Sequence, residues 1–255
     1  MSLNIVFSLV LIVLSAVLIL IYTLQRKAQL RRGRSQSTFR TIPAMMRLRR
    51  AMGLAVENGT RLHVSLGKAA ITSPAAPSAL VGLTSLERIA QMSSVSDAPP
   101  VVTSGDGTLA ILSQDTLRAS YRIANVPELY DPDRGRLAGA TPFAYTSAAL
   151  VVSHDENVSA NVLIGSFGVE AALLSDSEDP KNPFTLAASE SLAAQSVFYA
   201  TAKEPLIGEE LFAIPAYLQA GASHYASLKV QDILRWLLIL LMLGGAFLNL
   251  IGVIR

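Results

Sequence analysis

The chain has 255 residues, a formal net charge of +2 and no cysteine, which excludes disulfide bonds, thiolate metal sites and cysteine nucleophiles. Its composition is 51% hydrophobic, but this value averages over unlike segments. Residues 26–50 contain nine Lys and Arg and no acidic residue, whereas residues 51–232 contain 10 Lys and Arg against 19 Asp and Glu, a net charge of −9. This acidic balance argues against a nucleic-acid partner, because phosphate binding requires clustered cations.

The first 24 residues predict a transmembrane helix. Residues 3–24 are apolar and uncharged, and as a helix they reach about 33 Å, which is enough to cross a bilayer. The amino end carries no basic side chain, and Arg26 and Lys27 follow the apolar run, so the pattern favours an uncleaved anchor over a signal peptide. Because segments rich in Lys and Arg stay in the cytoplasm, we expect the amino terminus outside.

Residues 25–53 are predicted to form a basic cytoplasmic stem. Its cations can attract anionic lipid at about 1 kcal/mol each near the membrane surface, or they can act only as a topology signal. The pattern of residues 44–52 also fits a short amphipathic helix on the lipid headgroups. The cations expected at the membrane surface are Arg26, Lys27, Arg31, Arg32 and Arg34.

Residues 231–255 predict a second transmembrane helix. Between residues 233 and 254 the only charge is Arg235, and Trp236 stands where an interfacial aromatic residue is expected. This helix returns to the outside, so the carboxyl terminus is also external. We therefore expect a two-pass protein of the cell membrane, with the lipid bilayer around its ends and residues 54–230 as a cytoplasmic domain.

Within that domain, a pattern of strand followed by helix recurs four times. Short apolar or β-branched runs end in small-residue turns at residues 61–67, 100–105, 160–165 and 184–189. Each run is followed by a helical pattern, which predicts an α/β fold with a small, mostly parallel sheet, covering helices and one transmembrane helix at each end of the chain.

Several helices have recognisable starts. Asp106 or Thr108 can cap a helix over residues 109–123, and shorter helices are predicted over residues 85–92 and 191–201. Residues 142–152 fit either a helix or a strand. The long segment 125–141 is rich in Pro and Gly, which makes it a candidate lid or subunit contact, or a plain surface loop.

In a parallel sheet, ligands bind beyond the carboxyl ends of the strands. Two small-residue turns there, residues 104–108 and 165–170, each open a helix whose free N–H groups can hold an anion, but neither is a phosphate-binding fingerprint. Lys68 is either an anion contact or a solvated lysine. The acidic residues permit a divalent cation, or they are helix N-terminal acids without a ligand. The candidate ligand-binding residues are Ser104, Gly105, Asp106, Gly165, Ser166, Gly168, Glu170, Glu190 and Glu209.

Five stretches carry a resemblance to a known family. They are ENGTRLHVSLG (57–67), TSGD (103–106), LSQD (112–115), GSFGVE (165–170) and IGEELF (207–212). Together they resemble an uncharacterised bacterial family of membrane proteins that has one span at each end. The resemblance covers nearly the whole chain and implies a domain of unknown function. It brings no activity, cofactor or catalytic residue with it.

Two classes of function follow from these patterns. No Ser-His or metal-binding motif is present, and no catalytic residue is assigned, which favours a membrane-anchored scaffold or assembly subunit that binds itself or a protein partner through its acidic domain. The alternative is a ligand-binding or hydrolytic domain that uses the strand-end turns, with or without a divalent metal.

Overall fold

The computed structural model describes residues 3–32, 39–176 and 184–250. The chain divides into two compact units, of which one comprises Met1–Phe39 and Gly221–Arg255 and the other Arg40–Ala220. The first unit is helical, and the second contains the sheet.

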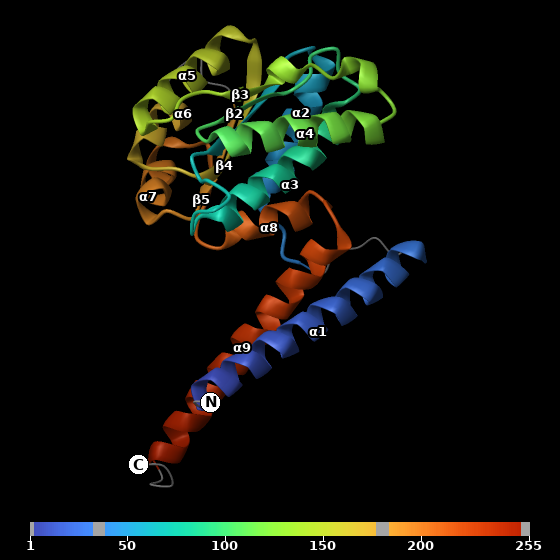
Figure 1. The fold of residues 1–255 in the computed structure, drawn as a ribbon. Helices are drawn as coiled ribbons and strands as arrows, with labels where there is room; N and C mark the ends of the chain where they lie inside the picture. The colour runs from blue at the N-terminus through green and yellow to red at the C-terminus, as the bar shows by residue number, and fades with distance from the viewer. Residues whose placement is uncertain (1–2, 33–38, 177–183, 251–255) are drawn as a thin grey trace. The chain divides into compact units, whose positions relative to one another are not determined.

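The helical unit contains two helices of 29 residues each that pack against one another, α1 (Leu3–Arg31) and α9 (Ala222–Leu250) (Figure 1). Their most apolar windows lie within Ser8–Arg31 and Ala222–Phe247, with mean hydropathies of 2.4 and 1.6, and only 0% and 6% of the residues in those windows are buried. By length and composition, both helices are sufficient to cross a membrane. The helix α9 begins at Ala222, and the predicted transmembrane segment starts at residue 231 within it.

The basic end of α1 packs onto α9. Arg26 is buried, and its guanidinium carbon lies 4.3 Å from the centroid of the Tyr225 ring. The Tyr225 ring in turn lies 4.6 Å from the ring of Phe39, measured between centroids. Arg26 therefore makes a cation–π contact with protein, and we do not assign it to the lipid surface. Of the other cations expected at that surface, Lys27, Arg31 and Arg32 are exposed, and Arg34 lies outside the described residues.

The second unit is built on one parallel sheet of six strands in the order β3-β2-β1-β4-β5-β6. This is a doubly wound order, and the direction of strand addition reverses between β1 and β4. The predicted α/β class and the four predicted strands are confirmed. The two further strands, β3 and β6, have three residues each, which is too short to give a periodic sequence signal. The strands are β1 (Arg61–Gly67), β2 (Val101–Ser104), β3 (Gly135–Leu137), β4 (Val158–Ser166), β5 (Phe184–Ser189) and β6 (Glu204–Leu206).

Alternating side chains of the strands point into two separate cores. On one face, Leu62, Val64 and Leu66 of β1 join a large apolar cluster with four helices. On the other, Leu163 and Ala187 join a smaller cluster. The helices of the large cluster are α2 (Pro43–Glu57), α3 (Ala76–Ser93), α4 (Gly107–Ile123) and α8 (Glu210–Tyr217). Those of the smaller cluster are α5 (Pro142–Asp155), the short 3₁₀ turn η3 (Val169–Ala171), α6 (Ala172–Ser175) and α7 (Leu192–Thr201).

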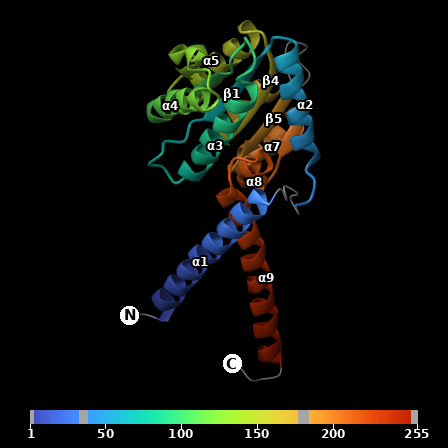
Figure 2. The ribbon, with the colours of Figure 1, turned by 90° about the vertical axis from the view of Figure 1, so that its right-hand side faces the viewer.

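The helix α2 belongs to the α/β unit. It contacts β4 and β5 (Figure 2), and it buries Met45, Leu48 and Met52 in the large cluster. Its apolar side is therefore covered by the sheet and cannot rest on lipid headgroups. The expected loop over residues 125–141 contains β3, and the ambiguous segment 142–152 is part of the helix α5.

A row of buried polar side chains lies between β1 and the smaller cluster. The two ring nitrogens of His63 lie 2.8 Å from Asn161 Oδ1 and 2.8 Å from Thr103 Oγ1. Burial lowers the pKa of His63 to about 4, although the hydrogen bond with Asn161 acts in the opposite direction. The buried Tyr145 hydroxyl contacts Ser65 and accepts a hydrogen bond of 3.1 Å from the Gly67 N–H. These contacts satisfy polar groups in the interior of the unit and fix α5 on the sheet.

Candidate functional site

At the carboxyl ends of β1 and β4, where this fold ordinarily binds ligands, backbone hydrogen bonds join the turns that follow the strands. The Lys68 N–H donates to the Ser166 carbonyl at 2.9 Å, and the Gly105 N–H donates to the Gly67 carbonyl at 2.8 Å. A Cβ added to Gly165 would stand 2.0 Å from the Leu66 carbonyl oxygen. Glycine is thus required at residue 165 because two backbones approach each other there.

An ion pair joins the turns that follow β1 and β4. The Lys68 ammonium lies 2.6 Å from Glu170 Oε1, and the side chains of Lys68 and Glu170 are 24% and 7% exposed. The Gly168 N–H also donates to Glu170, at 3.2 Å. Burial by itself would raise the pKa of Glu170, but the hydrogen bonds and the positive charge of Lys68 outweigh it and hold this pKa below its ordinary value. Glu170 is therefore an internal partner of Lys68.

The remaining predicted strand-end residues have separate structural roles. Asp106 caps α4 by accepting the Leu109 N–H at 3.0 Å, as the sequence predicted, and the buried Ser104 hydroxyl donates to the Arg136 carbonyl at 3.3 Å. Glu190 follows β5, and Glu209 directly precedes α8. In the part of the chain that the structure describes, no three His, Asp or Glu side chains gather as a metal-binding group. The four acidic residues proposed from sequence therefore do not form one cation site.

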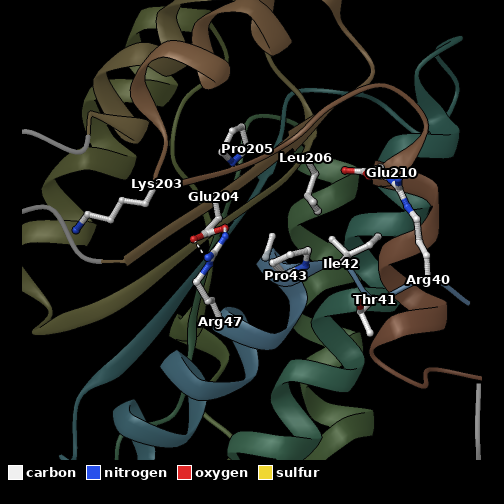
Figure 3. A pocket seen from close by; sticks show the side chains of 11 residues that line it. Arg40, Thr41, Ile42, Pro43, Arg47, Lys203, Glu204, Pro205, Leu206 and Glu210 are labelled. Carbon is white, nitrogen blue, oxygen red and sulfur yellow. Dashed lines mark hydrogen bonds and ion pairs between the residues drawn. The ribbon is translucent and has the colours of Figure 1, made fainter.

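A pocket of about 320 Å³ lies at the edge of the sheet, beside the edge strand β6 (Figure 3). Ile42, Pro43 and Leu206 supply apolar side chains to its wall. Arg47 donates to Glu204 Oε2 at 2.7 Å, and Arg40 pairs with Glu210. The lining residues are Arg40, Thr41, Ile42, Pro43, Ala44, Arg47, Lys203, Glu204, Pro205, Leu206 and Glu210.

The ion pairs at this pocket fasten the start of the α/β unit to its end. Arg49 donates to the Tyr217 carbonyl, and the Tyr217 hydroxyl donates to the Arg40 carbonyl at 2.6 Å. The segment that follows α1 in the chain is thereby held to β6 and α8, which precede α9. Sequence reasoning missed this arrangement because it counted these arginines as part of the stem, and their partners lie about 160 residues further along the chain.

The third notable feature is an apolar surface, which we call the apolar face. It is the exposed side of α5, η3, α6 and α7, which lie in a row along one side of the unit (Figure 1) and contact one another in sequence. Residues 142–153 and 192–201 contain no charged residue, and Glu170, the only one in residues 169–175, is buried. The large side chains on this face are 51% to 78% exposed: Phe143, Val151, Val169, Leu173, Leu192 and Tyr199.

The helices on the opposite side of the sheet differ in kind. Their outer surfaces carry the usual charges, for example Glu87 and Arg88 on α3 and Asp115, Arg118 and Arg122 on α4. Large apolar patches on a soluble protein commonly mark interaction sites. The near absence of charge from three successive covering helices, in which Asp155 at the last position of α5 is the exception, is the sequence signal that could have indicated this face.

Comparison with curated proteins and with solved structures gave no match. A family model described as a domain of unknown function (DUF6754) matches residues 2–255, and so takes in both terminal helices and the α/β unit. The expectation of an uncharacterised family that extends over nearly the whole chain agrees with this match. The chain therefore belongs to the DUF6754 family of domains of unknown function.

Proposed function

We propose that this protein is a membrane-anchored assembly subunit. Its two terminal helices hold it in the membrane, and its α/β unit, on the cytoplasmic side, binds a protein through the apolar face. The observation that carries the proposal is the exposed apolar surface of α5, η3, α6 and α7, which carry one exposed charged residue, Asp155 at the end of α5. Burying such a surface against a partner removes apolar area from water, at about 25 cal/mol per Å².

The ion pair of Lys68 with Glu170 supports an assembly role over the use of the strand-end turns for a ligand. A ligand that bound to Lys68 in place of Glu170 would leave the buried carboxylate without that partner. The apolar face requires no such rearrangement, because its side chains are already exposed.

The cytoplasmic placement of the unit is supported by the nine cations of residues 26–50. Because the chain has no cysteine, a single introduced thiol reports its own location. We expect Ser196→Cys, on the exposed side of α7, to react with a membrane-impermeant maleimide only after cells are permeabilised. Ser2→Cys, at the amino end, should react in intact cells. The reverse pattern would contradict the proposed orientation.

Binding at the apolar face can be tested with a photo-crosslinking residue placed in the full-length protein in its membrane. We expect p-benzoylphenylalanine in place of Tyr199 on α7 to form protein adducts. The matched control replaces Ile123, which is also exposed but lies at the end of the charged helix α4. Adducts at residue 199 and not at 123 would support the proposal. No adduct at 199, or equal adducts at both, would refute it.

A further inference from the structure

We infer that the apolar face binds the same face of a second copy of this chain and forms a two-fold symmetric dimer. The inference rests on the proposed assembly function and names its partner. In a two-fold dimer, each copy offers the same patch, so one apolar surface is sufficient for the whole interface.

The size of the face suits a stable dimer. Its six large side chains are 51% to 78% exposed, and α5, η3, α6 and α7 contact one another, so they lie on neighbouring elements. At about 150 to 220 Å² for a fully exposed large apolar side chain, they offer on the order of 700 Å². A standard interface takes about 800 Å² from each partner, whereas the largest patch on an ordinary monomer is about 300 to 600 Å².

Charge favours a second copy as the occupant. The unit Arg40–Ala220 contains 13 Lys and Arg against 18 Asp and Glu, a net charge of −5. A basic partner would be drawn to the acidic surfaces of the unit, and two copies would repel each other through those same surfaces. The apolar face, whose only exposed charge is Asp155 at the end of α5, is where two like-charged copies can meet with the least repulsion. A partner for this face must itself present an uncharged apolar surface, and the chain already has one.

Anchoring in one membrane would further assist the encounter. Copies that cross the bilayer in the same direction are restricted to two dimensions and to related orientations, which raises the effective concentration of one face near another. A two-fold axis along the membrane normal relates two such copies without reversing either of them.

The test uses charge exchange between two full-length copies that carry different affinity tags and are co-expressed in membranes. The acidic variant is Leu192→Glu with Tyr199→Glu, and the basic variant is Leu192→Lys with Tyr199→Lys. Wild-type copies should co-purify. Each variant should co-purify with itself at least about tenfold less, because like charges then meet in an apolar contact. Acidic and basic copies co-expressed together should recover most of the signal, since opposite charges then face each other.

The control is Ile111→Glu with Ile123→Glu, which adds the same charge to exposed positions of α4 and should leave co-purification unchanged. Circular dichroism of each variant verifies that the fold is retained. Wild-type copies that do not co-purify would overturn the dimer, as would folded variants that fail to recover when mixed.

The two proposals fail in distinguishable ways. If the copies do not co-purify but crosslinks from residue 199 reach a different protein, the dimer is wrong and the assembly function stands. If residue 199 gives no protein crosslink, the assembly function is wrong, and the dimer at this face is wrong with it.

Discussion

Replacing Lys68 with methionine tests whether the ion pair at the junction of β1 and β4 stabilises the fold. Lys68→Met keeps most of the side-chain volume but leaves the Glu170 carboxylate, whose side chain is 7% exposed, with only the backbone N–H groups of Gly168 and Glu170 as donors. Loss of a hydrogen bond to a buried charged group costs about 1.5 to 3 kcal/mol. Since Lys68 is 24% exposed, solvent recovers part of this, and we expect a loss near 2 kcal/mol at about pH 7.

The pH dependence makes this prediction more specific. In the wild type, the pKa of Glu170 in the folded state lies below its ordinary value. Its contribution to stability is therefore present above the pKa of the unfolded chain, about 4.3, and is lost as the pH falls through the folded-state value. In Lys68→Met, the hydrogen bond and the positive charge of Lys68 no longer lower this pKa, so less stability is gained as the pH rises. The difference between the two proteins should thus shrink from about pH 7 to about pH 4.

The assay is urea unfolding of the full-length protein in detergent micelles, followed by circular dichroism. The double variant Lys68→Met with Glu170→Gln is the control, because it removes the stranded charge and should recover part of the stability and lose the added pH dependence. The reasoning is refuted if Lys68→Met loses less than about 0.5 kcal/mol at about pH 7, or if its loss is the same at both pH values.

Substitutions at Arg47, His63 and Gly165 test the remaining packing and polar contacts. Arg47→Met should lower the free energy of unfolding by about 1 to 2 kcal/mol. A double-mutant cycle with Glu204→Gln measures the coupling energy of this pair, and a coupling energy of zero would show that the pair does not hold the chain. His63 has a folded-state pKa of about 4, below its unfolded value, so the wild type should lose roughly 3 kcal/mol in urea unfolding as the pH falls from 7 to 4. His63→Gln should flatten that slope, and an unchanged slope would assign it to other groups. Gly165→Ala should destabilise the protein by about 2 to 3 kcal/mol. Its control, Gly53→Ala, has open space around it in α2 and should stabilise the protein by about 0.5 to 1 kcal/mol. Equal thermal midpoints of the two variants would contradict the close approach of the backbone at residue 165 to Leu66.

Features with local causes could be predicted from the chain in order. An apolar run long enough to span a bilayer is contiguous in sequence, so both terminal helices could be predicted, although the start of α9 could not. Asp106 was predicted, as an alternative to Thr108, to cap a helix, and the N–H that it accepts is only three residues away. The four longer strands were recognised because each is a continuous run of residues with strand propensity.

Features that join distant segments could not be predicted in that way. Arg47 looks like any other cation of the basic stem until the fold brings it to Glu204. Glu170 looks like a free acid at a ligand-binding turn until the carboxyl ends of β1 and β4 close together and place Lys68 beside it. Short edge strands such as β3 and β6 are determined by pairing with a neighbour, not by their own three residues.

The sequence by itself determined two apolar helices and an acidic α/β unit between them, because hydropathy, charge and strand–helix alternation are properties of contiguous residues. Only the tertiary structure decided which charges are internal partners and which apolar residues remain outside. Leu192 and Phe198 belong to the same uncharged helix, but the sheet covers Phe198 and leaves Leu192 exposed. That division, which defines the apolar face, depends on packing between segments that are far apart in the chain.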